Sequence, residues 1–172
     1  MPTPVGHALA GLAVAGFSAG PARPRPLHVA VLIFCATAPD LDLVLRLIDG
    51  ANHHRGPSHS VGLALLVGLS GWVFRRLGVD LPSPWVLSAA WGSHVLLDYL
   101  GIDTNPPFGE MALWPLTRDF FISPLPLFYD VPRAFTAEAI RHNLIAVSIE
   151  VLVLAPLAWL ACSRFLRKVK AP

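Results

Sequence analysis

The stretch SVGLALLVGLSGWVFRRL, residues 60–77, decides the fold class of this chain. It is almost wholly apolar, and it ends on the pair Arg75 and Arg76. An apolar run that closes on two arginines is typical of a membrane helix whose end meets the lipid–water boundary. The stretch therefore predicts a transmembrane helix.

The composition of the whole chain agrees with a membrane protein. Of its 172 residues, 54% are hydrophobic and 14% are charged, and the mean hydropathy is +0.58. Such a chain is too apolar for an ordinary soluble domain and too short for a second compact unit, so we expect one membrane-embedded domain over residues 1–172. The net charge of +2 is small and the basic residues form short clusters. We therefore expect no nucleic-acid partner.

Four further apolar segments accompany the first, so we expect an all-α, polytopic helical membrane bundle with about five transmembrane helices. Pro39 is placed to bend or end the regular part of the second segment along the chain. The segment nearest the N-terminus has no Lys or Arg before it, which favours a retained helix over a signal peptide. Cys35 and Cys162 lie inside apolar segments and are expected to be small buried residues rather than a disulfide. The four segments cover residues 5–20, 27–47, 84–100 and 143–165.

Positive charge orients this bundle. If the helices alternate in direction, eight of the thirteen Lys and Arg residues fall on one side, in the turns at 23–25 and 75–76 and in the tail at 164–170. The positive-inside rule places that side in the cytoplasm and predicts an N-out, C-in topology. Ten of the eleven acidic residues fall on or near the opposite side, with Asp80 as the exception.

Residues able to bind a metal gather toward the predicted outer side. An ionisable group in or beside a membrane segment costs about 2.5–3.5 kcal/mol on insertion scales, so such groups are rare without a function. Only Lys and Arg determine the predicted orientation. The candidate ligands, which are His, Asp and Glu, nevertheless all fall at one depth near the outer side, and this independently indicates a metal centre. The candidate ligands are His7, Asp40, Asp42, His54, His59, His94, Asp98 and Glu150.

Asp40 and Asp42 follow Pro39 at the point where the chain leaves regular helix. Paired carboxylates suit a divalent cation, as terminal or bridging ligands. The alternative is an aspartate that caps a helix end at the membrane interface.

The densest motif is HRGPSHS, residues 54–60. Its glycine–proline pair predicts a tight turn that returns His54 and His59 to one point. Ser58 is placed to cap the next helix or to hydrogen-bond a ligand. Arg55 offers a planar fork for a phosphate or carboxylate, so Arg55 and Ser58 are the predicted substrate-binding residues. The alternative is a solvated loop at the membrane interface.

His94 and Asp98 are four residues apart and therefore share one helix face. They form either a two-ligand metal clamp or an internal hydrogen-bonded pair. Asp103 follows in the next loop, where it could position water or substrate. Glu150 lies deep enough in the last segment to need a partner, which is either the metal or an internal hydrogen bond.

The chemistry that these residues favour is metal-assisted hydrolysis. The sequence has no glycine-rich phosphate cradle, no G-x-S-x-G motif and no CxxC pair, so a metal-activated water is the expected nucleophile. An unliganded carboxylate, Asp42 or Asp103, is the predicted general base. Mixed His and Asp ligation favours zinc, with manganese or iron as alternatives, and the site could hold one or two ions.

The motifs around these residues resemble a family of bacterial inner-membrane metal-dependent hydrolases of the YdjM/YbcI type, which also carries a LexA-binding label. The similarity covers nearly the whole chain, and Ser58 stands where the family usually has Thr. The resemblance implies a multi-pass hydrolase of the bacterial cytoplasmic membrane, and the LexA-binding label fits badly with a site that faces outward. The similar stretches are TPVGHALAG around His7, APDLD ending at Asp42, HRGPSHS, SHVLLD ending at Asp98, ALWPL around Trp114, and the acidic Glu150.

We therefore expect a membrane-bound metal-dependent hydrolase at the outer face, with membrane lipid as a partner and a lipid or phosphoester as substrate. A fold-level analogy to zinc-dependent phospholipase C, whose helical site also mixes His, Asp and Glu ligands, favours a lipid phosphoester. Two alternatives stay open, a metal-ion transporter and a non-catalytic scaffold whose metal ties the helices together. The sequence does not predict an oligomeric state.

The long loop at 102–141 is expected to lie on the membrane surface over the site. It is rich in aromatic residues, which gather at membrane–water interfaces. We expect them to form a belt or a lid. They include Trp114, Phe120, Phe121, Phe128 and Tyr129.

Overall fold

The apolar segments predicted from the sequence all form helices. The computed structural model describes residues 1–19 and 25–168, without the side chains of residues 164–168. Over these residues the chain is all-helical, with no strand longer than an isolated bridge, which confirms the predicted class. The elements are α1 Pro4–Ser18, α2 Pro26–Thr37, η1 Ala38–Leu41, α3 Asp42–Asp49, η2 Pro57–His59, α4 Val61–Arg76, α5 Pro84–Tyr99 and α6 Ala137–Lys168, where η marks a 3-10 helix.

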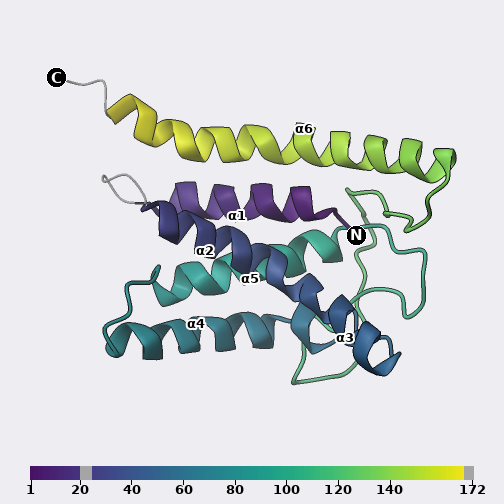
Figure 1. Ribbon diagram of the computed structural model, residues 1–172, viewed down its shortest axis with the longest axis horizontal. Coiled ribbons are helices and arrows are strands. Elements are labelled where there is room, and N and C mark those ends of the chain that lie inside the picture. The colour runs from purple at the N-terminus through teal and green to yellow at the C-terminus, as the bar shows by residue number, and fades with distance from the viewer. Residues whose placement is uncertain (20–24, 169–172) are drawn as a thin grey trace.

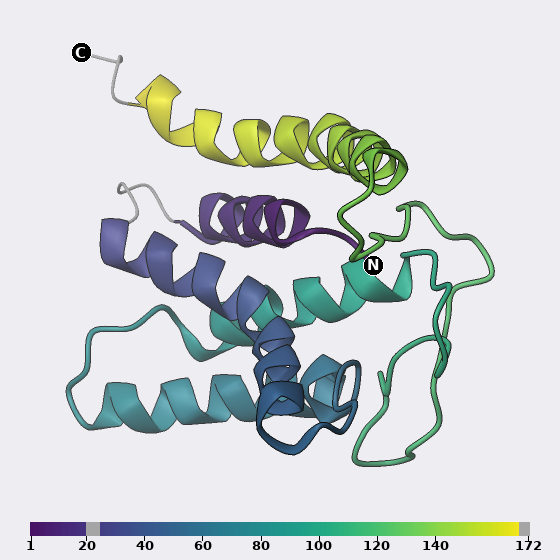
Figure 2. The same ribbon diagram turned by 45° about the vertical axis from the view of Figure 1, so that its right-hand side comes forward.

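The helices run back and forth along one long axis (Figure 1). Helix α6 packs on α1, α1 packs on α2 and α5, and α5 packs on α4. The N-terminus, α3, the start of α4, the end of α5 and the long loop before α6 all lie at the same end of the bundle (Figures 1 and 2). This end collects the candidate ligands, and Glu150 of α6 lies beside the start of α1 at the same level.

Pro39 interrupts the second apolar segment. Helix α2 ends at Thr37, the chain tightens into η1, and α3 then leaves the direction of α2 (Figure 2). Proline has no N–H to continue the helical ladder, and the break falls where the sequence predicts it. Gly50 ends α3 with a left-handed φ of 74°, a conformation that glycine adopts without strain. The broken segment brings Asp40 and Asp42 into irregular backbone at the end of the bundle.

Small residues allow the helices to approach closely. A Cβ added to Gly16 of α1 would lie 2.5 Å from the Cβ of Ala161 in α6, and one added to Gly68 of α4 would overlap Oγ of Ser88 in α5. Close approach through small residues is a common way for membrane helices to associate.

The outer surfaces of the helices carry many exposed apolar side chains, among them Phe34, Leu69, Trp72, Leu152 and Trp159. Among the described residues, one helix, Ala137–Ser163, is long and apolar enough to cross a membrane. Helices α1, α2, α4 and α5 have 12 to 16 residues. Helices of that size extend about 18–24 Å, which is less than the hydrocarbon thickness of about 30 Å. Five complete spans therefore stay a prediction.

Backbone hydrogen bonds hold the loop between α5 and α6 in place. Isolated bridges pair Gly101 with Phe128 and Glu110 with Phe121. The backbone N–H of Phe128 donates to the carbonyl oxygen of Leu100, and its ring is only 2% exposed, packed with Ala10, Leu97 and Leu154. The expectation that Phe128 belongs to an aromatic belt on the surface is therefore wrong, because this pairing turns its ring into the core.

Candidate metal centre

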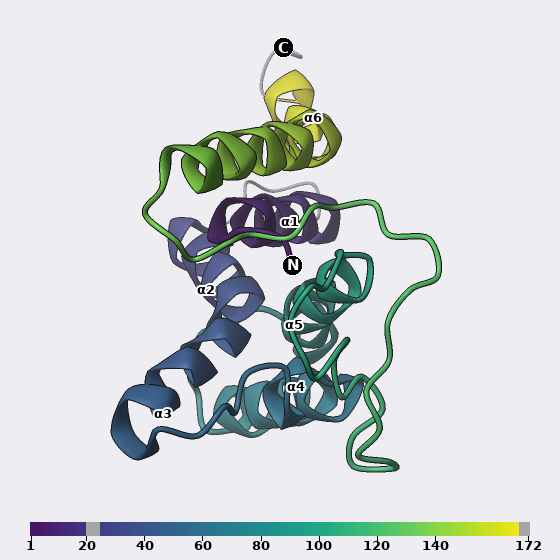
Figure 3. The same cartoon turned by 90° about the vertical axis from the view of Figure 1, so that its right-hand side faces the viewer.

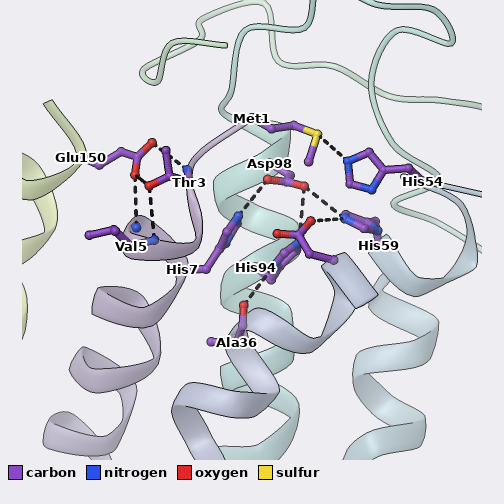
Figure 4. A network of polar contacts seen from close by, with 12 residues as sticks. Met1, Thr3, Val5, His7, Ala36, His54, His59, His94, Asp98 and Glu150 are labelled. Carbon is purple, nitrogen blue, oxygen red and sulfur yellow. Dashed lines mark hydrogen bonds and ion pairs between the residues drawn. The ribbon is translucent and has the colours of Figure 1, made fainter. Parts of the chain in front are cut away.

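Five candidate ligands come together at the end of the bundle. They arrive from four different elements, and Figure 4 shows the labelled rings and the Asp98 carboxylate turned toward one another. The three imidazoles and Asp98 are buried, and Asp40 is half-buried. We call this group the His/Asp cluster; it consists of His7 of α1, Asp40 of η1, His59 of η2, and His94 and Asp98 of α5.

The distances within the His/Asp cluster suit a shared cation. Oδ2 of Asp98 lies 3.3 Å from Nε2 of His59 and 3.4 Å from Nε2 of His94, and Oδ1 of Asp98 lies 3.3 Å from Nε2 of His7. Oδ1 of Asp40 lies 3.6 Å from Nε2 of His59 and 3.7 Å from Nε2 of His94. Ligand bonds of 2.0–2.1 Å in a tetrahedral zinc site place neighbouring donor atoms about 3.3 Å apart. The observed spacings therefore lie close to the edges of such a tetrahedron.

The same atoms are buried without a hydrogen-bond partner. Buried polar atoms are nearly always satisfied in folded proteins, and leaving one unsatisfied costs free energy. A divalent cation would satisfy these atoms: donor atoms of Asp40, His59, His94 and Asp98 all lie within 4.8 Å of one another, and His7 contacts the other oxygen of Asp98. The unpartnered atoms are Nε2 of His7, His59 and His94, Oδ1 of Asp40, and both oxygens of Asp98.

A second group lies beside the His/Asp cluster and shares His59 with it. It contains Asp42 and His54, and its donor atoms are also close enough to hold an ion. Here, however, the contacts are hydrogen bonds. Asp42 accepts from Ser58 Oγ at 2.6 Å and lies 2.8 Å from Nδ1 of His54 and 3.2 Å from Nδ1 of His59. Asp42 therefore supports His59 from the far side of its ring, as carboxylates do around metal-bound histidines.

Ser58 belongs to this support. Its hydroxyl donates to Asp42, while Ser60 caps α4 by accepting from the N–H of Leu63 at 3.0 Å. Of the two alternatives predicted for Ser58, the structure therefore has the hydrogen bond to a candidate ligand and not the helix cap. A substrate-binding role for Ser58 stays a prediction.

The ring of His94 is fixed by the backbone. Its Nδ1 lies 2.8 Å from the carbonyl oxygen of Ala36, which can only accept, so Nδ1 carries the proton and Nε2 is free to face Asp98. The ring also stacks on His7, with centroids 3.7 Å apart and an interplanar angle of 16°. Both contacts hold the imidazole in the orientation that ligation needs.

Opposing effects act on the pKa of His59. Burial lowers the pKa, but the carboxylates of Asp40, Asp42 and Asp98 raise it more, and the result lies well above the ordinary value. Without a cation, the imidazole therefore carries a proton at neutral pH. A metal ion would have to displace this proton.

Glu150 does not join the His/Asp cluster. Its carboxylate accepts from the N–H of Thr3 at 2.8 Å, from Oγ1 of Thr3 at 2.5 Å and from the N–H of Gly6 at 3.1 Å (Figure 4). The two N–H groups are backbone donors that the start of α1 leaves free. The structure therefore shows the internal hydrogen-bonded alternative rather than ligation, and Glu150 holds the residue next to His7 in place.

Asp103 holds Arg55. The two side chains form a buried ion pair, and Asp103 also accepts from the N–H of Gly109 at 2.7 Å. Arg55 has a left-handed φ of 67° and donates from Nη2 to the carbonyl oxygen of Asn105 at 2.9 Å. Because Asp42 and Asp103 are both engaged by other side chains, a general-base role for either stays a prediction.

Glu110 is a buried acid that the sequence reasoning missed. It is 0% exposed, and neither carboxylate oxygen has a hydrogen-bond partner. Burial, and then the charge of Asp98, raise the pKa of Glu110 to about 9. It lies in a loop without periodicity, so no spacing signal in the sequence marks it.

A cavity of about 830 Å³ opens beside the His/Asp cluster and reaches Asp40 and His54. Three arginines line it, Arg46 of α3, Arg55 before η2 and Arg133 before α6, and we call it the arginine cavity. The predicted substrate residue Arg55 therefore does stand beside the candidate ligands. Arg46 and Arg133 were not predicted, because nothing in their local sequence links them to the motif.

The fold and the site define an all-helical protein with a candidate metal centre at one end of its bundle and apolar outer surfaces. The chain belongs to the YdjM inner membrane protein family, since a family model with that description matches residues 1–169. This confirms the resemblance seen in the sequence and makes the exposed apolar surfaces those of an inner membrane protein. Comparisons with curated proteins and with solved structures gave no match.

Proposed function

We propose that the protein is a metal-dependent hydrolase of the inner membrane whose site opens at the outer face. One observation supports this most strongly: buried donor atoms of Asp40, His59, His94 and Asp98 gather within 4.8 Å of one another, and they have no hydrogen-bond partners of their own. A cluster of titratable groups in a cleft, with a cavity beside it, is the usual mark of a catalytic site.

In this proposal the ion would be held by Asp40, His59, His94 and Asp98. His7 would either hydrogen-bond the second oxygen of Asp98 or bind the ion directly. Zinc is favoured by the mixture of imidazole and carboxylate donors. A divalent ion held there would lower the pKa of a bound water toward 7 and polarise a substrate oxygen. The protein's own part is to fix the rings.

The arginine cavity supports a substrate with an anionic group. A guanidinium presents a rigid fork of donors that matches phosphate or carboxylate oxygens. Arg55 is fixed by Asp103 and Asn105 at a wall of the cavity that also contains Asp40. A phosphoester bound at Arg55 would therefore lie beside the ligand set, and we propose a lipid or other phosphoester as substrate.

The position of the cluster favours a hydrolase over the two alternatives. A transporter needs a pathway that opens to both sides of the membrane. These donors come from the start of α1, from η1 and η2 and from the second half of α5, which lie toward one end of the bundle (Figure 1). A structural metal site is closed by protein ligands, whereas the arginine cavity reaches Asp40.

The test is a measurement of metal content and turnover on the purified protein in detergent. We expect about one zinc per chain by mass spectrometry, and hydrolysis of bis(p-nitrophenyl) phosphate or a short-chain phospholipid. Asp98→Asn and His59→Ala should lose both. His28→Ala is the matched control, because His28 lies at the opposite end of the bundle, 3.2 Å from Asp80.

Other outcomes would overturn the proposal. Bound metal without turnover of any phosphoester in the panel would indicate the scaffold. Metal flux into liposomes that depends on Asp98 would indicate transport.

A further inference from the structure

The arginine cavity has features beyond those of an anion site, and they identify the kind of phosphoester that it takes. The inference rests on the proposed function and specifies its substrate class. The cavity lies between α3 and two parts of the long loop, residues 102–106 and 130–134. These residues lie at the end of the bundle where α3 turns away from the other helices (Figure 3).

Arg55 provides a buried hydrogen-bond donor in the wall of the cavity. Arg55 is among the most buried charged residues, at 5% exposed, and its Nε has no hydrogen-bond partner. A buried donor without an acceptor is unfavourable until an acceptor arrives. Nε of Arg55 therefore points to a ligand with an acceptor oxygen.

The acidic residues of the cavity wall do not cancel its arginines. Asp103 is paired with Arg55, and Asp130 lies 3.0 Å from Nε2 of His142 and accepts from Thr104. The third acid of the wall, Asp40, faces the imidazoles of His59 and His94. Within the described part of the chain, neither Arg46 nor Arg133 forms an ion pair. Both are therefore available to an anion that enters the cavity.

Arg133 also places that anion near the site. Its Nη2 lies 3.3 Å from Nε2 of His54, whose other nitrogen contacts Asp42 at 2.8 Å. A phosphate held by Arg133 and Arg55 would thus lie next to the residues that support His59.

The surface beside the mouth of the cavity is apolar. Leu43 of α3 lines the cavity, while Leu47 and Ile48 of the same helix are 85% and 77% exposed. Leucine and isoleucine this exposed on a short surface helix are typical of a segment that contacts lipid. A soluble phosphoester would gain nothing from contact with this apolar surface, whereas an acyl chain would pack on it.

We propose that the arginine cavity binds the phosphate head group of an anionic phospholipid, whose acyl chains lie along the exposed apolar side of α3. The substrate then comes from the membrane and not from solution. Arg46, Arg55 and Arg133 recognise the head, and Leu47 and Ile48 recognise the chains.

Binding measurements on the zinc-loaded protein in detergent micelles test this. The probes are dioctanoyl phosphatidic acid, dioctanoyl phosphatidylcholine and glycerol 3-phosphate. We expect phosphatidic acid to bind at least about tenfold more tightly than either of the others, which is a difference of about 1.4 kcal/mol. Equal affinity for phosphatidic acid and glycerol 3-phosphate would overturn the inference.

Variants separate recognition of the head from recognition of the chains. Arg133→Gln should weaken phosphatidic acid and glycerol 3-phosphate alike. The double change Leu47→Asn and Ile48→Asn should weaken phosphatidic acid only, and these exposed positions allow it without loss of folding. Arg118→Gln is the matched control, because Arg118 is an exposed arginine of the same loop outside the cavity.

The failure of this inference differs from the failure of the proposed function. Hydrolysis of bis(p-nitrophenyl) phosphate with no preference for lipid would contradict the inference and keep the hydrolase. Selective binding of phosphatidic acid without any turnover would contradict the hydrolase and keep the lipid site.

Discussion

The carboxylate of Asp42 lies 3.2 Å from Nδ1 of His59, and the opposite nitrogen of the ring lies 3.3 Å from Asp98. A single imidazole therefore has a supporting carboxylate on one side and the His/Asp cluster on the other. A carboxylate in this position fixes the tautomer and the angle of the ring, and it makes the free nitrogen a better ligand.

Asp42→Asn should therefore weaken zinc binding without abolishing it. We expect a loss of about 10–100-fold in affinity, the usual effect of changing a residue that supports a ligand. Asp98→Ala should remove stoichiometric zinc altogether. Competition with a chromogenic chelator measures both, and Asp80→Asn at the other end of the bundle is the control. Unchanged affinity in Asp42→Asn would show that this carboxylate does not hold the ring for metal binding.

Zinc binding should release a proton at pH 7. The pKa of His59 is raised well above its ordinary value, so the ion has to replace a proton there. Below that pKa the apparent affinity should rise about tenfold for each pH unit, because one proton competes with the ion. Calorimetry in two buffers with different ionisation enthalpies counts the proton. An identical heat in both buffers would mean that His59 is already neutral.

Glu110→Gln should flatten the pH dependence of stability. Burial raises the pKa of Glu110 from its ordinary value of 4.5 to about 9 in the folded protein, so between these values the folded state binds the proton and the unfolded state does not. Stability is then highest on the acid side and falls by about 1.4 kcal/mol per pH unit as the pH rises toward 9. Thermal unfolding in detergent from pH 5.5 to 8.5 should show this fall in the unchanged protein and a smaller one in Glu110→Gln. Parallel curves would contradict a protonated Glu110.

Glu150→Ala should destabilise the start of α1. It leaves the N–H groups of Thr3 and Gly6 without an acceptor, which costs about 1–3 kcal/mol for each buried donor. The melting temperature and the affinity for zinc should fall together, because His7 follows Gly6 directly. Thr3→Ser keeps the hydroxyl and serves as the control. If Glu150→Ala lost zinc with no change in melting temperature, Glu150 would be a ligand after all.

Much of the architecture follows from local pattern. The apolar segments, the break at Pro39 and the gathering of the candidate ligands at one end were predicted because each depends on composition, proline chemistry or alternation of direction. The last helix begins at Ala137 and not near residue 143. Its first turns are polar, so hydropathy missed them, although Oγ1 of Thr136 accepts from the N–H of Ala139 in a typical helix cap.

The parts that the sequence did not predict depend on long-range contacts. The long loop brings Glu110 and Arg133 to the site, and the short helix α3 brings Arg46. Neither segment has a hydrophobic periodicity from which its position could be predicted. The sequence predicts a surface position for Phe128, whereas its pairing with Gly101 places its ring in the core. The sequence could not show whether Glu150 forms internal hydrogen bonds or binds a metal. The answer depends on the packing of α6 against α1.

The hydrogen bonds between Glu150 and Thr3 join residues 147 positions apart. During biosynthesis α1 is made well before α6, which carries the carboxylate that anchors it. The turn that holds His7 can therefore take its final place only after α6 has packed on α1. A chain cut before α6 would present His59, His94 and Asp98 beside a His7 that lacks this anchor.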